Sequence, residues 1–183
     1  MLINGKLILR IIEEKDLEII RNWRISKDIR DSFEDKTIIS KLQQQKWYEK
    51  ISLDNSQYFF IAENNNESFG VLNIQNINFK HRTATVGWYF IKEKNVSSLI
   101  IQSVMLLLDY AFDELNIRKI YSDVLETNNS ALSFNSKIGF EVEGIRKKHI
   151  FHNGKYIDLI LVGMFHENYL NSVEKYRKKF FRI

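Results

Sequence analysis

Two carboxylates near the end of one predicted strand are the first candidates for chemistry in this sequence. Residues 119–125 alternate β-branched and aromatic side chains as a strand does, and Asp123 and Glu126 lie near its carboxyl end. A carboxylate in such a place can take up a proton directly or through water, although a solvated charge is the plainer alternative. The chain has no cysteine, which excludes thiol nucleophiles and disulfides and leaves the redox compartment open.

Aromatic and basic side chains elsewhere offer contacts to an anionic ligand. A guanidinium suits a diphosphate, and an indole ring can stack on a nucleotide base. The alternatives are packing in the core for the tryptophans and a solvated surface position for the arginines and histidines. Two histidines in one hairpin are too few for a metal site, so we expect no bound metal. The candidates are Trp23, Trp47, Trp88, Arg24, Arg30 and His149.

Length and composition favour a single domain. A chain of 183 residues with 44% hydrophobic residues can bury a sizeable core, so we expect one domain over 1–183. Its 27 basic and 23 acidic side chains give a net charge of +4, and this mild positive field suits small anions such as CoA or a nucleotide. We expect the basic residues of 170–183 to form the solvated end of a C-terminal helix; binding to a membrane surface or nucleic acid is the alternative.

No apolar run approaches the roughly 20 residues of a membrane span, and acidic residues interrupt the N-terminus before a signal sequence could form. We therefore expect a cytoplasmic protein.

Alternation and helical spacing divide the first half of the chain into strands and helices. We expect a strand at 6–12 and then a helix with Leu17, Ile20 and Trp23 on one face. Ser40 and Gln43 have the form of a capping box, which predicts a helix over 41–53. Strands at 57–63, 69–77 and 83–91 would form an antiparallel meander, and a wide apolar surface predicts a buried helix over 97–116.

The second half is organised around residues 119–140. After the strand, a polar break at 126–129 supplies an asparagine that can cap a helix, which we expect over 130–138 with Gly139 as its stop. Strands at 141–151 and 155–162 would then form a hairpin through the Asn153-Gly154 turn. These elements predict an α+β domain with a mixed, mostly antiparallel sheet of about seven strands, one long central helix and flanking helices.

Residues 128–140, NNSALSFNSKIGF, resemble the last motif of the GNAT superfamily of N-acetyltransferases. The resemblance extends over most of the chain. Within the superfamily the sequence is similar to ribosomal-protein and amino-sugar acetyltransferases, and most to those acting on UDP-linked 4-amino-4,6-dideoxy sugars in pseudaminic acid biosynthesis. The segments that carry it are Leu9-Arg10, Trp23-Arg24, Gln45-x-Trp47-Tyr48, Asp109-Tyr110-Ala111-Phe112, Gly144-Ile145-Arg146 and Asn153-Gly154-Lys155-Tyr156-x-Asp158.

The resemblance implies an acetyl-CoA-dependent N-acetyltransferase in which the amine attacks the thioester directly. Backbone N–H groups at Tyr89, Phe90 and Ile91 would polarise the thioester carbonyl. The pyrophosphate would lie at the start of the central helix, against Asn95, Val96, Ser97, Ser98 and Leu99. Further cofactor contacts would come from Asn128, Phe134 and Lys137. A nucleotide-linked amino sugar, as the acceptor, would contact Trp23, Arg24, Arg30, Trp88 and His149.

Four positions differ from the superfamily pattern. Ser98 and Ile100 replace the usual small residues of the pyrophosphate loop, and Thr85 stands where a glutamate is often found. Asn135 replaces the usual tyrosine; its amide can hydrogen-bond a thiolate but cannot protonate it. This leaves Asp123 and Glu126, with Asn135, as the catalytic candidates.

Two other functions stay open. One is an N-terminal acetyltransferase of a ribosomal protein, and the other is a non-catalytic binding module of the same fold. Exposed strand edges would be compatible with a homodimer.

Overall fold

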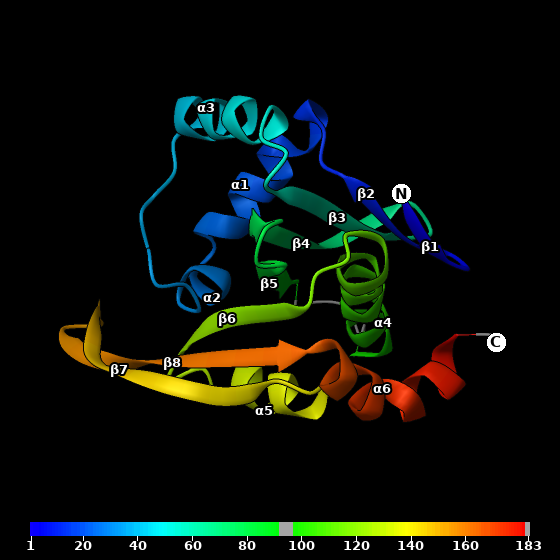
Figure 1. The fold of residues 1–183 in the computed structure, drawn as a ribbon. Helices are drawn as coiled ribbons and strands as arrows, with labels where there is room; N and C mark the ends of the chain where they lie inside the picture. Colours follow the sequence, from blue (N-terminus) through cyan, green and yellow to red (C-terminus); the bar gives the residue numbers. More distant parts are fainter. Residues whose placement is uncertain (92–96, 182–183) are drawn as a thin grey trace.

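The computed structural model describes residues 1–91 and 97–181, which fold around one mixed sheet (Figure 1). Within those residues the sheet has eight strands in the order β1-β2-β3-β4-β5-β6-β8-β7. Neighbouring strands are antiparallel except β5 and β6, which run parallel. The strands are β1 Leu2–Asn4, β2 Leu7–Ile11, β3 Tyr58–Asn64, β4 Glu67–Asn78, β5 Thr83–Phe90, β6 Lys119–Leu125, β7 Glu141–His152 and β8 Lys155–Phe165.

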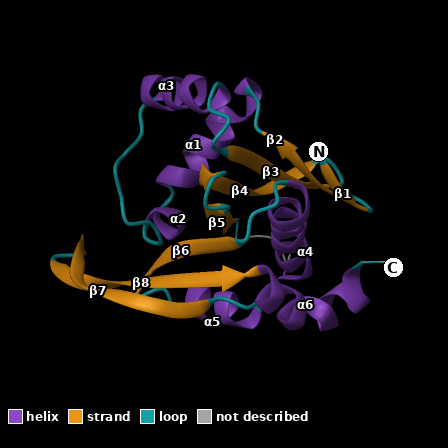
Figure 2. Ribbon diagram, viewed as in Figure 1, coloured by secondary structure: helices purple, strands orange, loops and turns teal. Residues whose placement is uncertain are grey.

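The helices lie around this sheet, as Figure 2 shows. A 3-10 turn at Glu14–Asp16 precedes the first of them, and a π-helical turn at Tyr110–Glu114 continues the long central one. The helices are α1 Leu17–Ile25, α2 Lys27–Arg30, α3 Lys41–Ser52, α4 Ser97–Asp109, α5 Asn129–Lys137 and α6 His166–Phe180.

The predicted α+β fold with a mixed sheet and a long central helix is confirmed. The strand at 119–125 has the predicted bounds, and Ser40 and Gln43 form the expected reciprocal capping box. The sheet has eight strands where about seven were predicted, because Leu2–Asn4 pairs back onto β2. Gly5, with φ of +62°, closes this short hairpin. Three residues are too few for alternation to reveal a strand.

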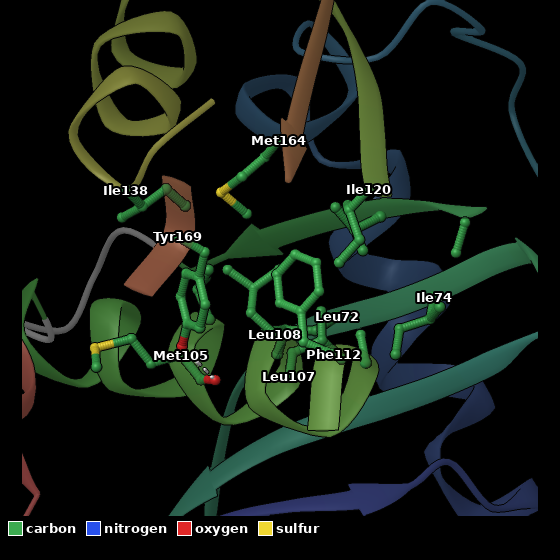
Figure 3. Packing of buried hydrophobic residues seen from close by; sticks show 14 of the residues in the cluster. Leu72, Ile74, Met105, Leu107, Leu108, Phe112, Ile120, Ile138, Met164 and Tyr169 are labelled. Carbon is green, nitrogen blue, oxygen red and sulfur yellow. Dashed lines mark hydrogen bonds between the residues drawn. The ribbon is translucent and has the colours of Figure 1, made fainter. Parts of the chain in front are cut away.

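The two faces of the sheet pack on different helices. On one face, the main core joins α4, α6 and the strands through Leu72, Met105, Leu108 and Tyr169, all of them buried (Figure 3). On the other face, Ile20 of α1 packs with Phe59 and Ile61 of β3 in a smaller cluster that also includes Ile51 of α3. Each such side chain contributes about 1.5–3 kcal/mol when it is buried. The sheet is therefore held from both sides.

The parallel strands β5 and β6 separate after three residue pairs. The ladder joins Thr83 to Lys119, Ala84 to Ile120 and Thr85 to Tyr121. Beyond these pairs, β5 continues on β4 to Phe90, while β6 continues on β8 to Leu125. The strands therefore open as a V in the middle of the sheet, and backbone groups on its inner edges have no strand partner.

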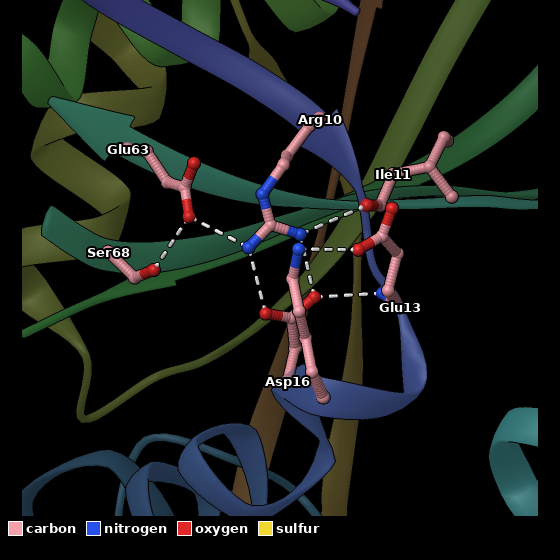
Figure 4. Close-up of polar contacts among 7 residues, drawn as sticks. Arg10, Ile11, Glu13, Asp16, Glu63 and Ser68 are labelled. Carbon is pink, nitrogen blue, oxygen red and sulfur yellow. Dashed lines mark hydrogen bonds and ion pairs between the residues drawn. The ribbon is translucent and has the colours of Figure 1, made fainter. Parts of the chain in front are cut away.

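An ion-pair network fixes the chain where β2 leads into α1 (Figure 4). Arg10 donates from its two terminal nitrogens to Asp16 at 2.7 and 2.8 Å, and it also reaches Glu63 at 2.7 Å. Burial is the largest single influence and opposes the ionisation of Asp16, but the hydrogen bonds from Arg10 and from the Glu13 N–H group, together with the charges of Arg10 and Lys15, outweigh it and lower the pKa of the carboxyl group. This part of the acetyltransferase-like motif is therefore structural, and it sets the direction of α1.

Helix α6 closes the molecule. The Tyr169 hydroxyl and the Arg177 guanidinium both donate to Asp109 at 2.6 Å. Val173 is fully buried, and the Phe180 carbonyl accepts from Asn4 at 3.1 Å. The expected C-terminal helix is therefore present up to Phe180. Lys175, Lys178 and Lys179 are exposed on it as predicted, while Val173 and Arg177 dock its other face on the rest of the molecule. None of the helices in the described part of the chain is long and apolar enough to cross a membrane.

Candidate active site

A cavity of about 160 Å³ lies in the V between β5 and β6. Its walls come from the inner edges of the two strands, from α5, and from the loop that follows α2. The loop and α5 come from distant parts of the sequence. The lining residues are Ser32, Phe33, Glu34, Val86, Gly87, Trp88, Ser122, Asp123, Val124, Leu125, Asn128, Ala131 and Asn135.

The backbone of β5 directs hydrogen-bond donors into this V. The N–H group of Ile91 donates to the Phe69 carbonyl at 2.8 Å, so it is directed at β4. Because successive N–H groups alternate along a strand, those of Trp88 and Phe90 are directed to the side from which β6 has diverged. Such a donor can hydrogen-bond the oxygen of a bound carbonyl group. Of the three residues predicted for this role, Phe90 is so placed, whereas the Tyr89 and Ile91 amides are on the β4 side.

Helix α5 adds two asparagines to the cavity. Asn128 caps the helix as predicted, its side-chain oxygen accepting from the Ala131 N–H group at 3.2 Å. Asn135 is only 4% exposed, and its side-chain oxygen has no hydrogen-bond partner among the residues the structure describes. Leaving a buried polar group unpaired costs roughly 1–3 kcal/mol. Asn135 lines the cavity, so a ligand N–H or O–H group bound there could satisfy this oxygen.

A larger cavity of about 460 Å³ adjoins the first and shares Phe33, Glu34, Gly87 and Asp123 with it. Five charged side chains line it, and four of them form ion pairs. Lys119 contacts Glu143 at 2.5 Å, and Arg146 contacts Asp123 at 3.6 Å. The fifth charge is Glu34.

Glu34 lies on the loop after α2 and is open to solvent in the cavity. Within residues 1–91 and 97–181 its carboxylate forms no hydrogen bond and no ion pair. Desolvation by the surrounding walls, and then repulsion from Asp123, raise the pKa of Glu34, while His149 and Arg146 act in the opposite direction. The larger cavity therefore carries one unpaired negative charge next to the V.

An aromatic pocket of about 340 Å³ continues the same groove toward α3. Phe33, Trp47 and Tyr89 line it, and burial raises the pKa of the Tyr89 hydroxyl. Its charged residue is Arg24, whose guanidinium stacks on the Phe33 ring at 3.5 Å from the centroid. One terminal nitrogen of Arg24 is buried without a hydrogen-bond partner in the described part of the chain. Burial lowers the pKa of the Arg24 guanidinium group. This end of the groove therefore suits apolar or anionic groups.

A clasp made by Asp31, Lys36, His152 and Asn153 joins the loop after α2 to the tip of the β7–β8 hairpin. The Lys36 ammonium donates to Asp31 at 3.0 Å and to the Asn153 side chain at 2.9 Å. A ring nitrogen of His152 lies 3.1 Å from the Asp31 carbonyl oxygen. Hydrogen bonds from Lys36 and then Lys27 hold the pKa of Asp31 at about 2. The clasp therefore fixes both ends of the segment that carries Glu34.

The other residues predicted for the site are distributed more widely. Ser97, Ser98 and Leu99 form the first turn of α4, where N–H groups can hold an anion, whereas Asn95 and Val96 lie outside the described residues. Phe134 packs edge-on against Trp88 at 6.1 Å. The linings given above do not include Trp23, Arg30, Glu126, Lys137 or His149.

Two of these positions can be explained. Trp23 packs against the cluster formed by α1, α3 and β3, so it belongs to the core. Glu126 lies beyond the end of β6, and its charge acts on Lys147 of the hairpin. Of the two predicted carboxylates, Asp123 is therefore the one that reaches the cavities. No group of three or more histidine or acidic side chains suited to a metal ion occurs in the described segments.

Sequence reasoning missed Glu34. It follows a helix of only four residues in a loop, and no periodicity marks it. A Phe33-Glu34 pair in a polar segment was the available signal. Its place in the site depends on the packing of the loop near β6, which the sequence does not show.

Residues 9–161 match a protein family described as "Acetyltransferase (GNAT) domain". Two similar curated proteins are named spermidine N(1)-acetyltransferase. The one from Vibrio cholerae serotype O1 is 28% identical over 172 residues, which cover 93% of this chain and 99% of that protein. The one from Escherichia coli K12 is 28% identical over 162 residues, covering 88% and 87% of the two chains.

The fold is also similar to a solved structure. The crystal structure of spermidine N-acetyltransferase from Vibrio cholerae, in complex with CoA and spermine, superimposes with a TM-score of 0.82 at 28% identity. The match covers 92% of this chain and all of that chain.

Proposed function

This chain belongs to the acetyltransferase (GNAT) family and is an acetyl-CoA-dependent N-acetyltransferase, and we propose that its acceptor is a primary amine of a polyamine such as spermidine. Two relatives that match most of the chain are named for spermidine acetylation. The observation that carries the proposal on the chain itself is the unpaired Glu34 carboxylate beside the V.

A polyamine is a flexible chain of cationic amines, and it gains most from carboxylates that no basic side chain neutralises. In the larger cavity, Asp123 and Glu143 are paired with basic residues, which leaves Glu34 to receive a cation. The reacting amine would therefore lie next to Glu34. From there it is adjacent to Val86 and Gly87, where the two cavities meet.

The rest of the polyamine would extend along β6 and β8 rather than toward α3. Arg24 is the charged residue of the aromatic pocket, and it would repel a second cation. The larger cavity, at the other end of the groove, is lined by the paired carboxylates Asp123 and Glu143. Each of them can still accept a hydrogen bond from an ammonium group.

Acetyl-CoA would enter the V from the side of α4 and α5. The residues present fit a thioester there, because the Trp88 and Phe90 N–H groups can bind its carbonyl oxygen and the unpaired Asn135 oxygen can accept from a donor on the cofactor arm. The thioester supplies the activated acetyl group. The described residues that line the small cavity include no tyrosine, so we expect the leaving sulfur to be protonated from solvent.

The amino-sugar acceptor expected from sequence motifs has no support from these relatives. It would need an anion-binding region, and among the basic residues that the described linings of the groove contain, Lys119 and Arg146 are in ion pairs, which leaves Arg24 in the aromatic pocket to favour it. The polyamine would therefore pair with Glu34 at one end of the groove, and the nucleotide sugar would pair with Arg24 at the other end.

The experiment is a steady-state assay of CoA release by the purified protein with four acceptors. These are spermidine, n-butylamine, a UDP-linked 4-amino-4,6-dideoxy sugar and a peptide with a free N-terminus. We expect kcat/KM for spermidine to exceed that for n-butylamine by about tenfold, the worth of one added charge contact of about 1.4 kcal/mol. Preference for the nucleotide sugar or the peptide would reject the proposal.

A further inference from the structure

We propose that the Glu34 carboxylate accepts the proton that the acceptor ammonium must lose before its nitrogen can attack the thioester. This inference rests on the proposed acetyl transfer and assigns a catalytic residue to it. A primary ammonium ion has a pKa near that of lysine, about 10.4, so it is protonated at neutral pH and has no lone pair for attack. Some group at the site must therefore receive this proton.

Glu34 occupies the place from which that proton can be received. It lines the small cavity in the V together with Gly87 and Trp88, and it also lines the larger cavity. An amine that reaches the V from the larger cavity therefore passes this carboxylate. The side chain is open to the cavity, so an ammonium group can reach it.

The neighbouring carboxylate is less suited to the task. Asp123 has Arg146 at 3.6 Å, and protonation of Asp123 would remove one partner of that ion pair. Glu34 has no such partner in the described ranges, so it can gain and lose a proton without breaking a contact. Glu126 does not line either cavity.

The groups that face Glu34 also favour proton uptake. Asp123 on β6 disfavours its ionised form, while Arg146 and His149 on β7 favour it, and the surrounding walls desolvate it. The net effect is a pKa above the usual value for a glutamate, which makes it a better base than an exposed carboxylate. The clasp at Asp31 and Lys36 holds the loop on both sides of it.

The proton balance is as follows. The ammonium transfers one proton to Glu34, and the neutral nitrogen forms a bond to the thioester carbonyl carbon. The carbon–sulfur bond then breaks, the nitrogen loses a second proton, and the thiolate gains one to become the thiol of CoA. Glu34 returns its proton to solvent, so each turnover yields one acetamide, one CoA thiol and one released proton.

The test compares Glu34→Gln with wild type over a range of pH. The substitution keeps the size of the side chain and removes no hydrogen bond in the described part of the chain, so the melting temperature should not change. Glu49→Gln on α3 is the matched control, because Glu49 is exposed and lines none of the three cavities. We expect kcat to fall about 100-fold in Glu34→Gln at neutral pH and to be unchanged in the control.

The pH profile separates proton transfer from simple docking. The wild-type profile of kcat/KM should fall on the acid side as Glu34 becomes protonated, and Glu34→Gln should lack that limb. As the pH approaches about 10, solution supplies the neutral amine, so the difference in kcat between the two proteins should shrink. A higher KM with unchanged kcat, or a ratio that does not vary with pH, would overturn the assignment.

Failure of the proposed function would look different. If wild type acetylates another amine but not spermidine, the acceptor is wrong, and the same comparison can be made with the amine it does accept. If wild type releases CoA with spermidine while Glu34→Gln is as active, the acceptor is right and the base is wrong.

Discussion

Asn135 carries a buried amide oxygen that has no hydrogen-bond partner among the described residues, and this makes it a sensitive probe of the site. A folded protein tolerates such a group when a ligand satisfies it. The backbone carbonyl oxygen of Asn135 already has a hydrogen bond, which it accepts from the Phe140 N–H group at 3.0 Å. The side chain is therefore the part free to contact a cofactor.

We predict that Asn135→Leu binds acetyl-CoA more weakly without losing stability. Leucine has a similar volume and leaves no unpaired oxygen, so the melting temperature of the free protein should stay the same or rise. Loss of one hydrogen bond of about 0.5–1.5 kcal/mol should raise the Kd for acetyl-CoA roughly three- to tenfold, measured by calorimetric titration. A fall in melting temperature with unchanged affinity would show that the amide has a partner within the protein.

Local patterns revealed some site residues and not others. Asn128 could be predicted as a cap because the cap and its helix are adjacent in sequence. Asp123 could be placed at the end of a strand for the same reason. Glu34 and Asp123 are far apart in the chain, and their proximity depends on how the loop after α2 packs against β6. No local pattern contains that information.

The clasp connects the end of α2 to the tip of the β7–β8 hairpin and so positions the loop that carries Glu34. The α2 end and the hairpin tip each contribute polar groups, and the loop with Glu34 runs between them. In Figure 1 the tip of β7 and β8 lies at the end of the hairpin that is away from α6. The hairpin is long enough for its tip to contact Asp31 and Lys36, because β7 runs from Glu141 to His152.

We predict that Lys36→Met weakens acceptor binding selectively. The variant loses the contacts to Asp31 and Asn153, so the loop should move and the KM for spermidine should rise about threefold to tenfold. Lys36 and Asp31 are half-buried at the surface, where an ion pair contributes about 1 kcal/mol, so the melting temperature should change by only a few degrees. Lys27→Met is the matched control, because Lys27 pairs with the same Asp31 at 3.1 Å but makes no hairpin contact. Equal effects of the two variants on KM would contradict the clasp.

Gly139 sets the junction between α5 and the next strand. Its φ is +106°, and a Cβ there would lie 2.8 Å from the Asn168 carbonyl oxygen of α6. Gly154 in the hairpin turn has a φ of +81°, but a Cβ there would meet nothing within 4 Å.

We predict that Gly139→Ala is more destabilising than Gly154→Ala. Both alanines would adopt a left-handed backbone at about 1–2 kcal/mol, and only the first also displaces α6, at a further 1–3 kcal/mol or so. Urea unfolding of the two variants measures the difference directly. Similar losses of unfolding free energy would mean that α6 yields without cost.

Most elements followed from the sequence because their signals are local. The capping box of α3 and the Asn-Gly turn are examples, and Asn153 and Gly154 have the positive φ values that such a turn requires. The short β1 and α2 lacked enough residues to show a period. The divergence of β5 and β6 could be expected only from the resemblance to a family, since nothing in either strand's composition ends their pairing.

At the scale of the whole molecule, two adjoining cavities lead to the V between β5 and β6. Helices α4 and α5 contribute to the main core on one face of the sheet, whereas Phe33 of the loop after α2 packs on Tyr89, which belongs to the cluster on the other face. In the proposed arrangement, the cavities that meet at the V would give each substrate its own entrance. Direct transfer between them needs no covalent intermediate on the protein.

The charges of the groove agree with this division. Glu34 provides a negative charge next to the V, and Arg24 provides a positive one in the aromatic pocket beyond it. A polycation and a nucleotide sugar therefore make opposite demands on the same groove, so their competition tests the acceptor assignment.

The central claim is tested most directly by a competition in one reaction. The purified protein is given limiting acetyl-CoA with equal concentrations of spermidine and a UDP-linked 4-amino-4,6-dideoxy sugar, and mass spectrometry identifies which product carries the acetyl group. We predict acetyl-spermidine as the main product, formed in proportion to the CoA released. Acetylation of the nucleotide sugar, or consumption of acetyl-CoA with no acetylated polyamine, would contradict the account.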